Sequence, residues 1–229
     1  MNEILEKIKE IETQIEEGLW SYEIQEKKEE ALEIYLCSEV QLKTLGVTVG
    51  ESAYTEQQRV LSYCLMRQGN LLRQKGKSEE AVALGEREMV AAIASGDEVM
   101  LARSLMSNGS NYIVTGDVGK GLDLIEESRK LFEGGKSHDH KQGLGWYWIL
   151  QADLATAGLI QRKPSEIIEI TDQILEILEP IENWPGVARA YAARAKAHEN
   201  MGKEEKAEED RKKQQYYERK VEAEGESAG

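Results

Sequence analysis

A frame of small residues returns four times along this chain, and this repetition constrains the fold more strongly than any other feature. In each set the second position follows the first by seven residues and the third follows the second by five, and successive sets start 40, 46 and 40 residues apart. Self-similarity at such a period is typical of stacked helical hairpins. The four sets are Gly69, Gly76 and Ala81; Gly109, Gly116 and Gly121; Ala155, Arg162 and Ile167; and Ala195, Gly202 and Ala207.

The positions in this frame have distinct physical roles in a hairpin of two antiparallel helices. A small residue is needed where the helices approach most closely, so the first position of each set, such as Gly69 or Gly109, is predicted to lie at a close contact. The second position is predicted to end the first helix at a positive φ, which suits Gly76, Gly116 and Gly202. A phosphate-binding loop is the alternative, but no G-x-G-x-x-G string opens a helix after a strand.

Three of the sets lie in runs that resemble tetratricopeptide repeats (TPR). Residues 65–81, 105–121 and 192–207 follow the family's pattern of a small residue, a large one three positions later, a turn glycine and then alanine. The large places are held by Leu72, Tyr112 and His198. The unit at 146–182 departs from the pattern, because Gly158 stands at its large place and Arg162 replaces the turn glycine.

The resemblance covers about residues 50–220 and implies an all-α, right-handed solenoid of antiparallel helix pairs. A period near 40 residues, longer than the usual repeat of about 34, implies long helices. In this respect the sequence is similar to the long-repeat branch of the TPR family, which includes kinesin light chains and bacterial peptide-pheromone receptors. We expect acidic N-terminal helices at 1–50, repeats at 51–202, and a capping helix with a disordered tail at 203–229, the tail being 224–229.

Composition agrees with a helical protein that stays in the cytoplasm. Hydrophobic residues make up 40% of the chain and charged residues 31%, with only three prolines. No apolar stretch is long enough for a membrane span, and the acidic amino terminus does not resemble a signal peptide. Two cysteines do not make a disulfide framework, so Cys37 and Cys64 are predicted to be buried small hydrophobes.

Helical periodicity is clear in two other segments. Isoleucines at positions 4, 8, 11 and 15 form one stripe of a first helix, and a second helix is predicted from about Trp20 to Leu45. A loop is expected at 46–54. In the third repeat, isoleucines at 167, 170, 174, 177 and 181 form another core stripe.

The first and second helices of the predicted pairs differ in their balance of charged residues. First helices, taken as 56–75, 98–115, 141–163 and 186–201, carry eleven Lys or Arg against four Asp or Glu. Second helices, taken as 77–95, 117–133, 164–182 and 203–222, carry twelve against twenty-two, in a chain of formal net charge −14. Because first helices line the concave face in the TPR family, the resemblance implies a basic groove on an acidic body. Such a groove attracts acidic segments, whereas the acidic exterior disfavours nucleic acid.

The predicted peptide-binding residues share faces of the first helices at steps of three or four. Arg side chains suit carboxylate recognition through their forked donors. The alternative is that their stems only cover apolar helix surface. The predicted groove residues are Tyr63, Met66, Arg67, Asn70, Arg73, Arg103, Met106, Ser107, Ser110, Trp148, Arg189 and Lys196.

Some TPR proteins clamp a peptide's terminal carboxylate with Lys and Asn from one repeat and Asn from the next. By resemblance Asn70 matches the first Asn, but Met66 stands at the Lys place and Ser107 at the second Asn place. These departures argue against this particular clamp and leave peptide binding open. The two methionines, Met66 and Met106, are either adaptable ligand contacts or core filler. Of three adjacent aromatic residues at 146–148, Trp148 is the predicted groove anchor.

Catalysis, metal binding and cofactors find little support in the sequence. His138 and His140 flank Asp139 in a polar segment, but the remaining ligands of a closed metal site are missing. No cysteine has a nearby histidine, and no serine lies in a nucleophile-elbow string. His198 is predicted to pack against a neighbouring helix.

The sequence therefore predicts a non-enzymatic adaptor or scaffold that binds an acidic or C-terminal peptide segment of a protein partner. Two alternatives stay open. One is a self-assembling structural protein, a homo-oligomer formed through the isoleucine stripe at 4–15. The other is a peptide-sensing regulatory receptor.

Overall fold

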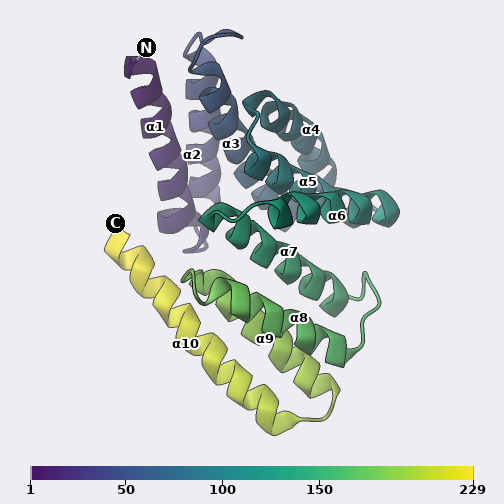
Figure 1. The fold of residues 1–229 in the computed structure, drawn as a ribbon. Coiled ribbons are helices and arrows are strands. Elements are labelled where there is room, and N and C mark those ends of the chain that lie inside the picture. Colours follow the sequence, from purple (N-terminus) through teal and green to yellow (C-terminus); the bar gives the residue numbers. More distant parts are fainter. Residues whose placement is uncertain (1, 229) are drawn as a thin grey trace. The chain divides into compact units, whose positions relative to one another are not determined.

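The computed structural model describes residues 2–228, and the side chains of 3–223 within them. Over this range the chain forms ten α-helices and one π-helical segment, and no strand (Figure 1). The elements are α1 (Asn2–Glu17), η1 (Gly18–Glu23), α2 (Lys28–Thr44), α3 (Tyr54–Gln74), α4 (Ser78–Ser95), α5 (Glu98–Val114), α6 (Val118–Gly134), α7 (His138–Thr156), α8 (Pro164–Leu178), α9 (Trp184–Asn200) and α10 (Glu204–Ala228).

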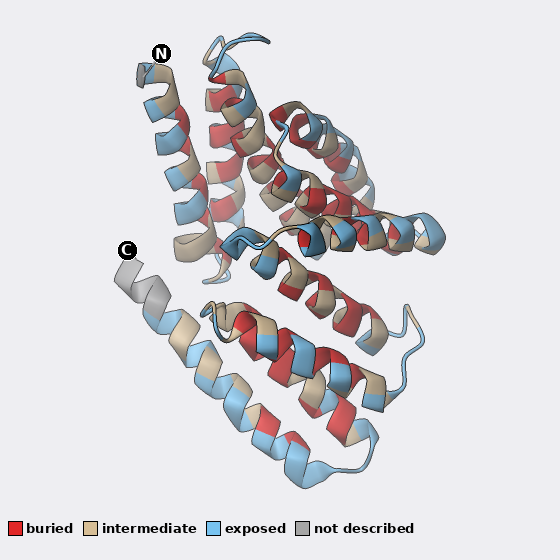
Figure 2. Ribbon diagram, viewed as in Figure 1, coloured by how far each residue is buried: buried red, intermediate tan, exposed pale blue. Residues whose placement is uncertain are grey.

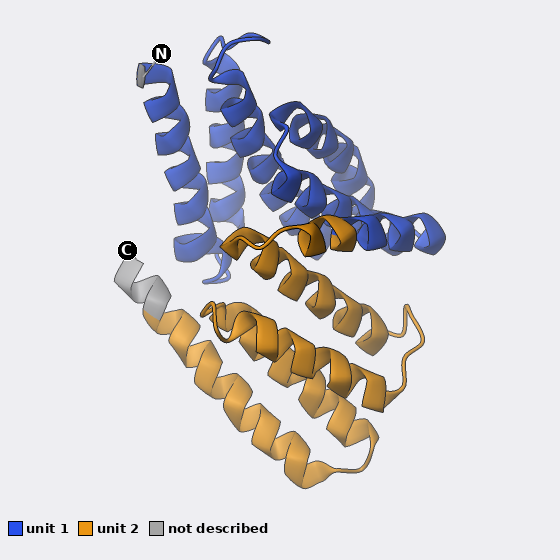
Figure 3. Cartoon of the chain, viewed as in Figure 1, with its two compact units in different colours: residues 1–128, 228–229 blue, residues 129–227 orange. Residues whose placement is uncertain are grey.

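The chain divides into two compact units, which are described separately (Figure 3). Unit 1 comprises residues 1–128 and 228–229, and unit 2 comprises residues 129–227. In unit 1, α3 packs against α2, α4 and α5, and in unit 2, α8 packs against α7 and α9. Neighbouring elements thus form antiparallel pairs, as the repeat frame predicts.

The core of unit 1 begins with the predicted isoleucine stripe of α1. Ile8, Ile11 and Ile15 are buried in a cluster that also holds Tyr35 and Leu42 of α2. Burying one such side chain contributes about 1.5–3 kcal/mol. Figure 2 shows the buried faces of these helices turned toward one another. The stripe is thus covered by the chain's own helices, which contradicts its predicted use as an exposed oligomerisation face.

The predicted helix from Trp20 to Leu45 is wrong at its start. The segment from Gly18 to Glu23 is π-helical, and α2 begins only at Lys28, after Glu26 takes a positive φ of 61°. Gly18 lies directly against Tyr35: a Cβ added there would be 2.8 Å from the Tyr35 ring. This close packing of the π-helical segment on α2 depends on a contact that helical periodicity does not reveal.

The close helix approach that is predicted at the first position of the frame is found between α5 and α6. A Cβ added to Gly109 of α5 would lie 2.6 Å from the carbonyl oxygen of Gly121 in α6, and the reverse distance is 2.5 Å. At Gly69 the prediction is wrong, because an added Cβ would meet only Leu84, at 4.0 Å. The predicted turn glycines are confirmed by positive φ values at Gly76, Gly116 and Gly202.

The third repeat has a different register from the predicted one. Helix α7 ends at Thr156, and Gly158, with a φ of 73°, is the turn glycine. Arg162 lies in the loop that follows, so the predicted seven-residue step does not apply here. The loop ends where Pro164 starts α8, since proline suits the first turn of a helix. Within α8, Ile167, Ile170 and Ile174 are buried as predicted.

Helix α10 is joined to α9 by polar contacts as well as by buried Ala207. His198 is buried and its Nδ1 lies 2.9 Å from Asp210 Oδ2, which confirms its predicted packing against a neighbouring helix. The backbone of α10 is helical to Ala228, past the end predicted at 222. Gly229 and the side chains of 224–228 lie outside the described residues, so disorder of the tail at 224–229 stays a prediction.

Candidate peptide-binding surface

The centre of the candidate site is Arg73, which joins α3 to α5. Its Nη2 donates to Asn70 Oδ1 and its Nη1 donates to Asn111 Oδ1, both at 2.7 Å. The Nδ2 of Asn111 donates in turn to the carbonyl oxygen of Ala81 at 3.0 Å, which fixes the orientation of the amide. The guanidinium of Arg73 is therefore held in place by two neutral amides.

Arg73 has no ion-pair partner among the described residues. Burial lowers its pKa, against an opposing effect of Glu88. Glu88 itself is buried, and burial raises its pKa well above 4.5, so its uncharged form is favoured. Its Oε2 accepts from Ser107 Oγ at 3.1 Å, whereas no group in the described part of the chain bonds to its buried Oε1. The charge of Arg73 thus lacks a compensating carboxylate.

Arg67 precedes Arg73 on α3 and, unlike Arg73, has an ion-pair partner. Its guanidinium bonds twice to the carboxylate of Glu23, at 3.2 Å from Nε to Oε2 and 2.5 Å from Nη2 to Oε1. The hydroxyl of Tyr35 donates to the same carboxylate at 2.8 Å. The predicted groove residue Arg67 is therefore already paired inside unit 1.

The other predicted residues of unit 1 lie on the same two helices, α3 and α5. Burial raises the pKa of Tyr63, while the charges of Arg67 and Arg103 act in the opposite direction. Ser107 and Ser110 are buried, and Ser110 donates to the carbonyl oxygen of Met106 at 2.9 Å. The structure thus brings Asn70, Arg73 and Ser107 into one polar cluster with Asn111 and Glu88. Met66 of α3 and Met106 of α5 are half-buried.

In unit 2 the predicted residues form a separate group. Arg189 pairs with Asp153 and lies over the ring of Trp146, 5.4 Å from its centroid. Trp148 packs edge-on against Tyr147, with ring centroids 4.9 Å apart, and contacts the core of the unit. Trp146, rather than Trp148, is therefore the aromatic neighbour of the cation. Lys196 binds Glu199 on its own helix at 3.0 Å.

Sequence reasoning missed Glu23, Asn111 and Glu88. A usable signal existed only for Asn111, which follows Ser107 by four residues and so shares its helix face. Glu23 lies 44 residues from Arg67, and Glu88 lies 19 residues from Ser107. Pairings over such separations depend on tertiary packing, so helical spacing does not reveal them.

The described residues also bear on metal binding, on membrane spans and on the state of the two cysteines. They hold no group of three or more His, Cys, Asp or Glu that could bind a metal ion, and His140 Nδ1 lies 2.6 Å from Ser137 Oγ at the start of α7. None of the helices described is long and apolar enough to span a bilayer. Burial raises the pKa of Cys64 to about 12, but Cys37 is exposed, so its predicted burial is wrong.

Comparison with known proteins identifies the fold. No family model and no curated protein matches the sequence. Among solved structures, a kinesin light chain-like protein of Podosopora anserina with nearly identical TPR-like repeats is 16% identical with a TM-score of 0.53, covering 94% of this chain and 98% of that one. BtubC (BKLC) of P. vanneervenii is 10% identical with a TM-score of 0.57, covering 96% and 92%.

The apo form of RapI has a similar fold, with 13% identity, a TM-score of 0.54, and coverage of 96% of this chain and 66% of that one. These structures share helical repeats with the present chain at identities that speak for the fold alone. The chain thus has an all-α fold of TPR-like helical repeats.

Proposed function

We propose that the protein is a non-enzymatic interaction scaffold that binds an acidic or C-terminal peptide segment of a protein partner on the α3–α5 face of unit 1. The observation that carries the proposal is Arg73, a preorganised guanidinium without a carboxylate partner in the described residues. A ligand carboxylate supplies the missing charge and forms charge-assisted hydrogen bonds, which are about twice as strong as neutral ones.

Asn70 is the residue that we expect to orient the bound segment. Its Oδ1 accepts from Arg73, and its Nδ2 makes no hydrogen bond with the residues described, so two donors remain for the backbone carbonyl groups of a peptide. Because Asn70 and Arg73 are one helical turn apart on α3, one ligand residue can use both. The half-buried Met66 and Met106, on the same two helices α3 and α5, provide adaptable apolar contacts.

Binding by this site is tested with pools of fluorescent acidic decapeptides, with either free or amidated C-termini. Replacing Arg73→Met is expected to weaken binding by about tenfold or more, because loss of one partner of a desolvated charge pair costs about 2–5 kcal/mol. Arg73→Lys, which keeps the charge without the fork, is expected to lose less. A preference for free C-termini identifies terminal carboxylate recognition.

The matched control is Arg162→Met in unit 2, which makes the same change at an exposed loop residue. Urea unfolding of each variant shows whether the fold is retained. Acidic pools that bind Arg73→Met as tightly as the unaltered protein would contradict the proposal. A peptide-sensing receptor would use the same surface, so this experiment is also its first test. No observation favours self-assembly through α1, whose stripe is buried.

A further inference from the structure

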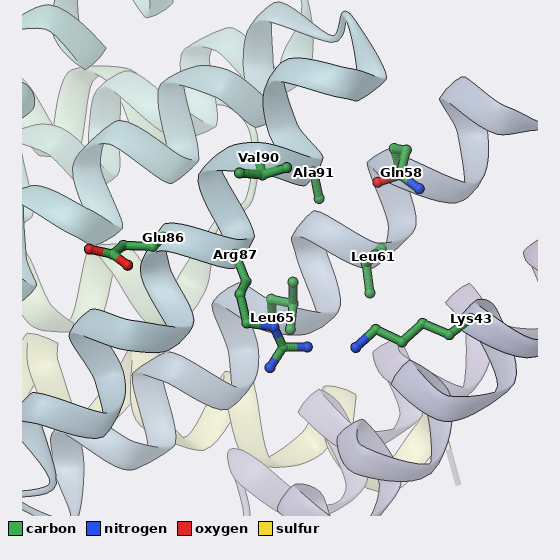
Figure 4. A pocket seen from close by; sticks show the side chains of 8 residues that line it. All are labelled: Lys43, Gln58, Leu61, Leu65, Glu86, Arg87, Val90 and Ala91. Carbon is green, nitrogen blue, oxygen red and sulfur yellow. The ribbon is translucent and has the colours of Figure 1, made fainter. Parts of the chain in front are cut away.

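A second surface of unit 1 involves a different face of α3 from the one that carries Asn70 and Arg73. It is a hollow of about 320 Å³ between α2 and α4, with α3 as its floor (Figure 4). On α3 the lining residues Gln58, Leu61 and Leu65 share a face that does not include Asn70 or Arg73. The remaining lining residues are Lys43 of α2 and Glu86, Arg87, Val90 and Ala91 of α4.

Exposed apolar side chains lie on both helices that flank the hollow, α2 and α4. Of the nine large hydrophobic side chains that are exposed in the described part of the chain, four lie on α2 and α4. Leu36 and Val40 share a helix face with Lys43, and Val90, which is 68% exposed, shares one with Ile93. Single exposed hydrophobics are common, but a contiguous group around a concavity marks an interaction surface.

The charges that point into the hollow are positive. Figure 4 shows the ends of Lys43 and Arg87 directed toward one another, whereas the carboxylate of Glu86 points away. Both cations bind one nearly buried carboxylate, Glu39, with Lys43 Nζ 2.6 Å from its Oε1. Two exposed cations therefore share one anion, so among these three groups the positive charge is in excess by one.

We propose that the hollow docks an amphipathic helix of a partner protein, with apolar side chains between α2 and α4 and acidic side chains at Lys43 and Arg87. A groove between two helical ridges accepts the ridge of a third helix, with anchors at spacings of three and four residues. Charge complementarity selects an acidic edge on that helix. A second copy of this chain is disfavoured as the occupant, because each copy carries a net charge of −14.

The probe is a synthetic peptide of about 18 residues, above the length at which isolated helices are marginal. It carries leucines at alternating steps of three and four and glutamates along both edges. A second peptide has lysine in place of every glutamate, and a third has a central proline that breaks the helix. Both ends are blocked, so no terminal carboxylate can occupy the Arg73 site. Binding is measured by fluorescence anisotropy.

The glutamate peptide is expected to bind, with about tenfold weaker binding for the lysine peptide and for the proline peptide. Val90→Asp is expected to reduce the affinity about tenfold without affecting the fold, because Val90 is largely exposed. Val114→Asp, the same change at an exposed residue of α5 outside the lining, is the matched control and is expected to bind normally. Arg73→Met is also expected to bind normally, which separates this surface from the proposed peptide site.

Three results would overturn the proposal. The first is no binding of the glutamate peptide at about 1 mM. The second is binding that Val90→Asp leaves unchanged. The third is a concentration-dependent dimer in sedimentation analysis that Val90→Asp abolishes, since the hollow would then hold a second copy.

Discussion

The carboxylate of Glu23 and the guanidinium of Arg67 form a buried ion pair across 44 residues of sequence. Burial lowers the pKa of Arg67, but the charge and hydrogen bond of Glu23, together with Tyr63 and Tyr35, raise it by more in sum, so the net shift is upward. Through this pair the π-helical segment is attached to α3. Arg67 thus has a structural role, unlike Arg73, whose guanidinium meets only amide oxygens.

Removing Arg67 is therefore expected to destabilise unit 1. Arg67→Met leaves the Glu23 carboxylate buried without its cation, a change that costs about 3–5 kcal/mol. The free energy of unfolding is measured by urea denaturation. The double variant Arg67→Met, Glu23→Gln is expected to recover part of the loss, because no uncompensated charge remains. A single variant as stable as the unaltered protein would show that the pair is not structurally important.

Alanine substitutions at two glycines of the frame are expected to have opposite effects. Gly109→Ala places a Cβ 2.6 Å from a backbone oxygen, and because backbone cannot move aside cheaply, we expect a loss of about 1–3 kcal/mol. Gly69→Ala meets only Leu84 at 4.0 Å, so the higher helix propensity of alanine is expected to stabilise the fold by up to about 1 kcal/mol.

Thermal unfolding of the two glycine variants measures this contrast directly. Each variant is the control for the other, since both add one methyl group at the same position of the repeat frame. Equal destabilisation by both would contradict the difference in packing between α3–α4 and α5–α6.

The part of the fold that could be predicted from the sequence depends on local spacing. The stripe of Ile8, Ile11 and Ile15 and the turn at Gly116 are properties of a single helix or its end, and both are confirmed. The π-helical segment was missed, because its packing of Gly18 against Tyr35 is tertiary. The register of the third repeat was missed because its loop is longer than those after α3 and α5.

For the candidate site, the sequence predicts which residues share a helix face, but it does not predict which side chains form ion pairs. Helical spacing places Asn70 and Arg73 on one face, and the structure joins them. The same spacing makes Arg67 equivalent to Arg73, whereas the structure gives only Arg67 a carboxylate. That difference arises from Glu23, which the fold brings to α3 from a segment far away in the sequence.

The buried carboxyl of Glu88 is expected to make stability depend on pH. The pKa of Glu88 in the folded chain is raised well above its ordinary value of 4.5. As pH rises, Glu88 therefore loses its proton first in the unfolded state. The stability that neutral Glu88 contributes is therefore fully present below about pH 4.5 and is lost as pH rises toward the folded pKa.

Urea unfolding of the unaltered protein and of Glu88→Gln between about pH 4 and pH 8 tests this expectation. The stability of the unaltered protein relative to Glu88→Gln is expected to fall as pH rises. Glu86→Gln, the same change at an exposed residue of α4, is the control. A difference between the unaltered protein and Glu88→Gln that is constant over this range would show that Glu88 titrates alike in both states.

Asp210 of α10 holds two side chains of α9, and its loss is expected to detach the start of α10. Its carboxylate accepts from Arg194 Nη2 at 2.8 Å and lies 2.9 Å from His198 Nδ1. Asp210→Ala leaves Arg194 with only the more exposed Asp172, and removal of one buried partner costs about 3–5 kcal/mol.

Limited proteolysis followed by mass spectrometry measures this detachment, with faster cleavage expected between Asn200 and Tyr217 in Asp210→Ala. Glu208→Ala is the control, because its pairs with Arg211 and Lys212 are exposed and such pairs contribute about 0–1 kcal/mol. Equal cleavage rates in the two variants would show that α10 is held by apolar contacts such as the stacking of Tyr217 on Tyr191, rather than by the Asp210 carboxylate.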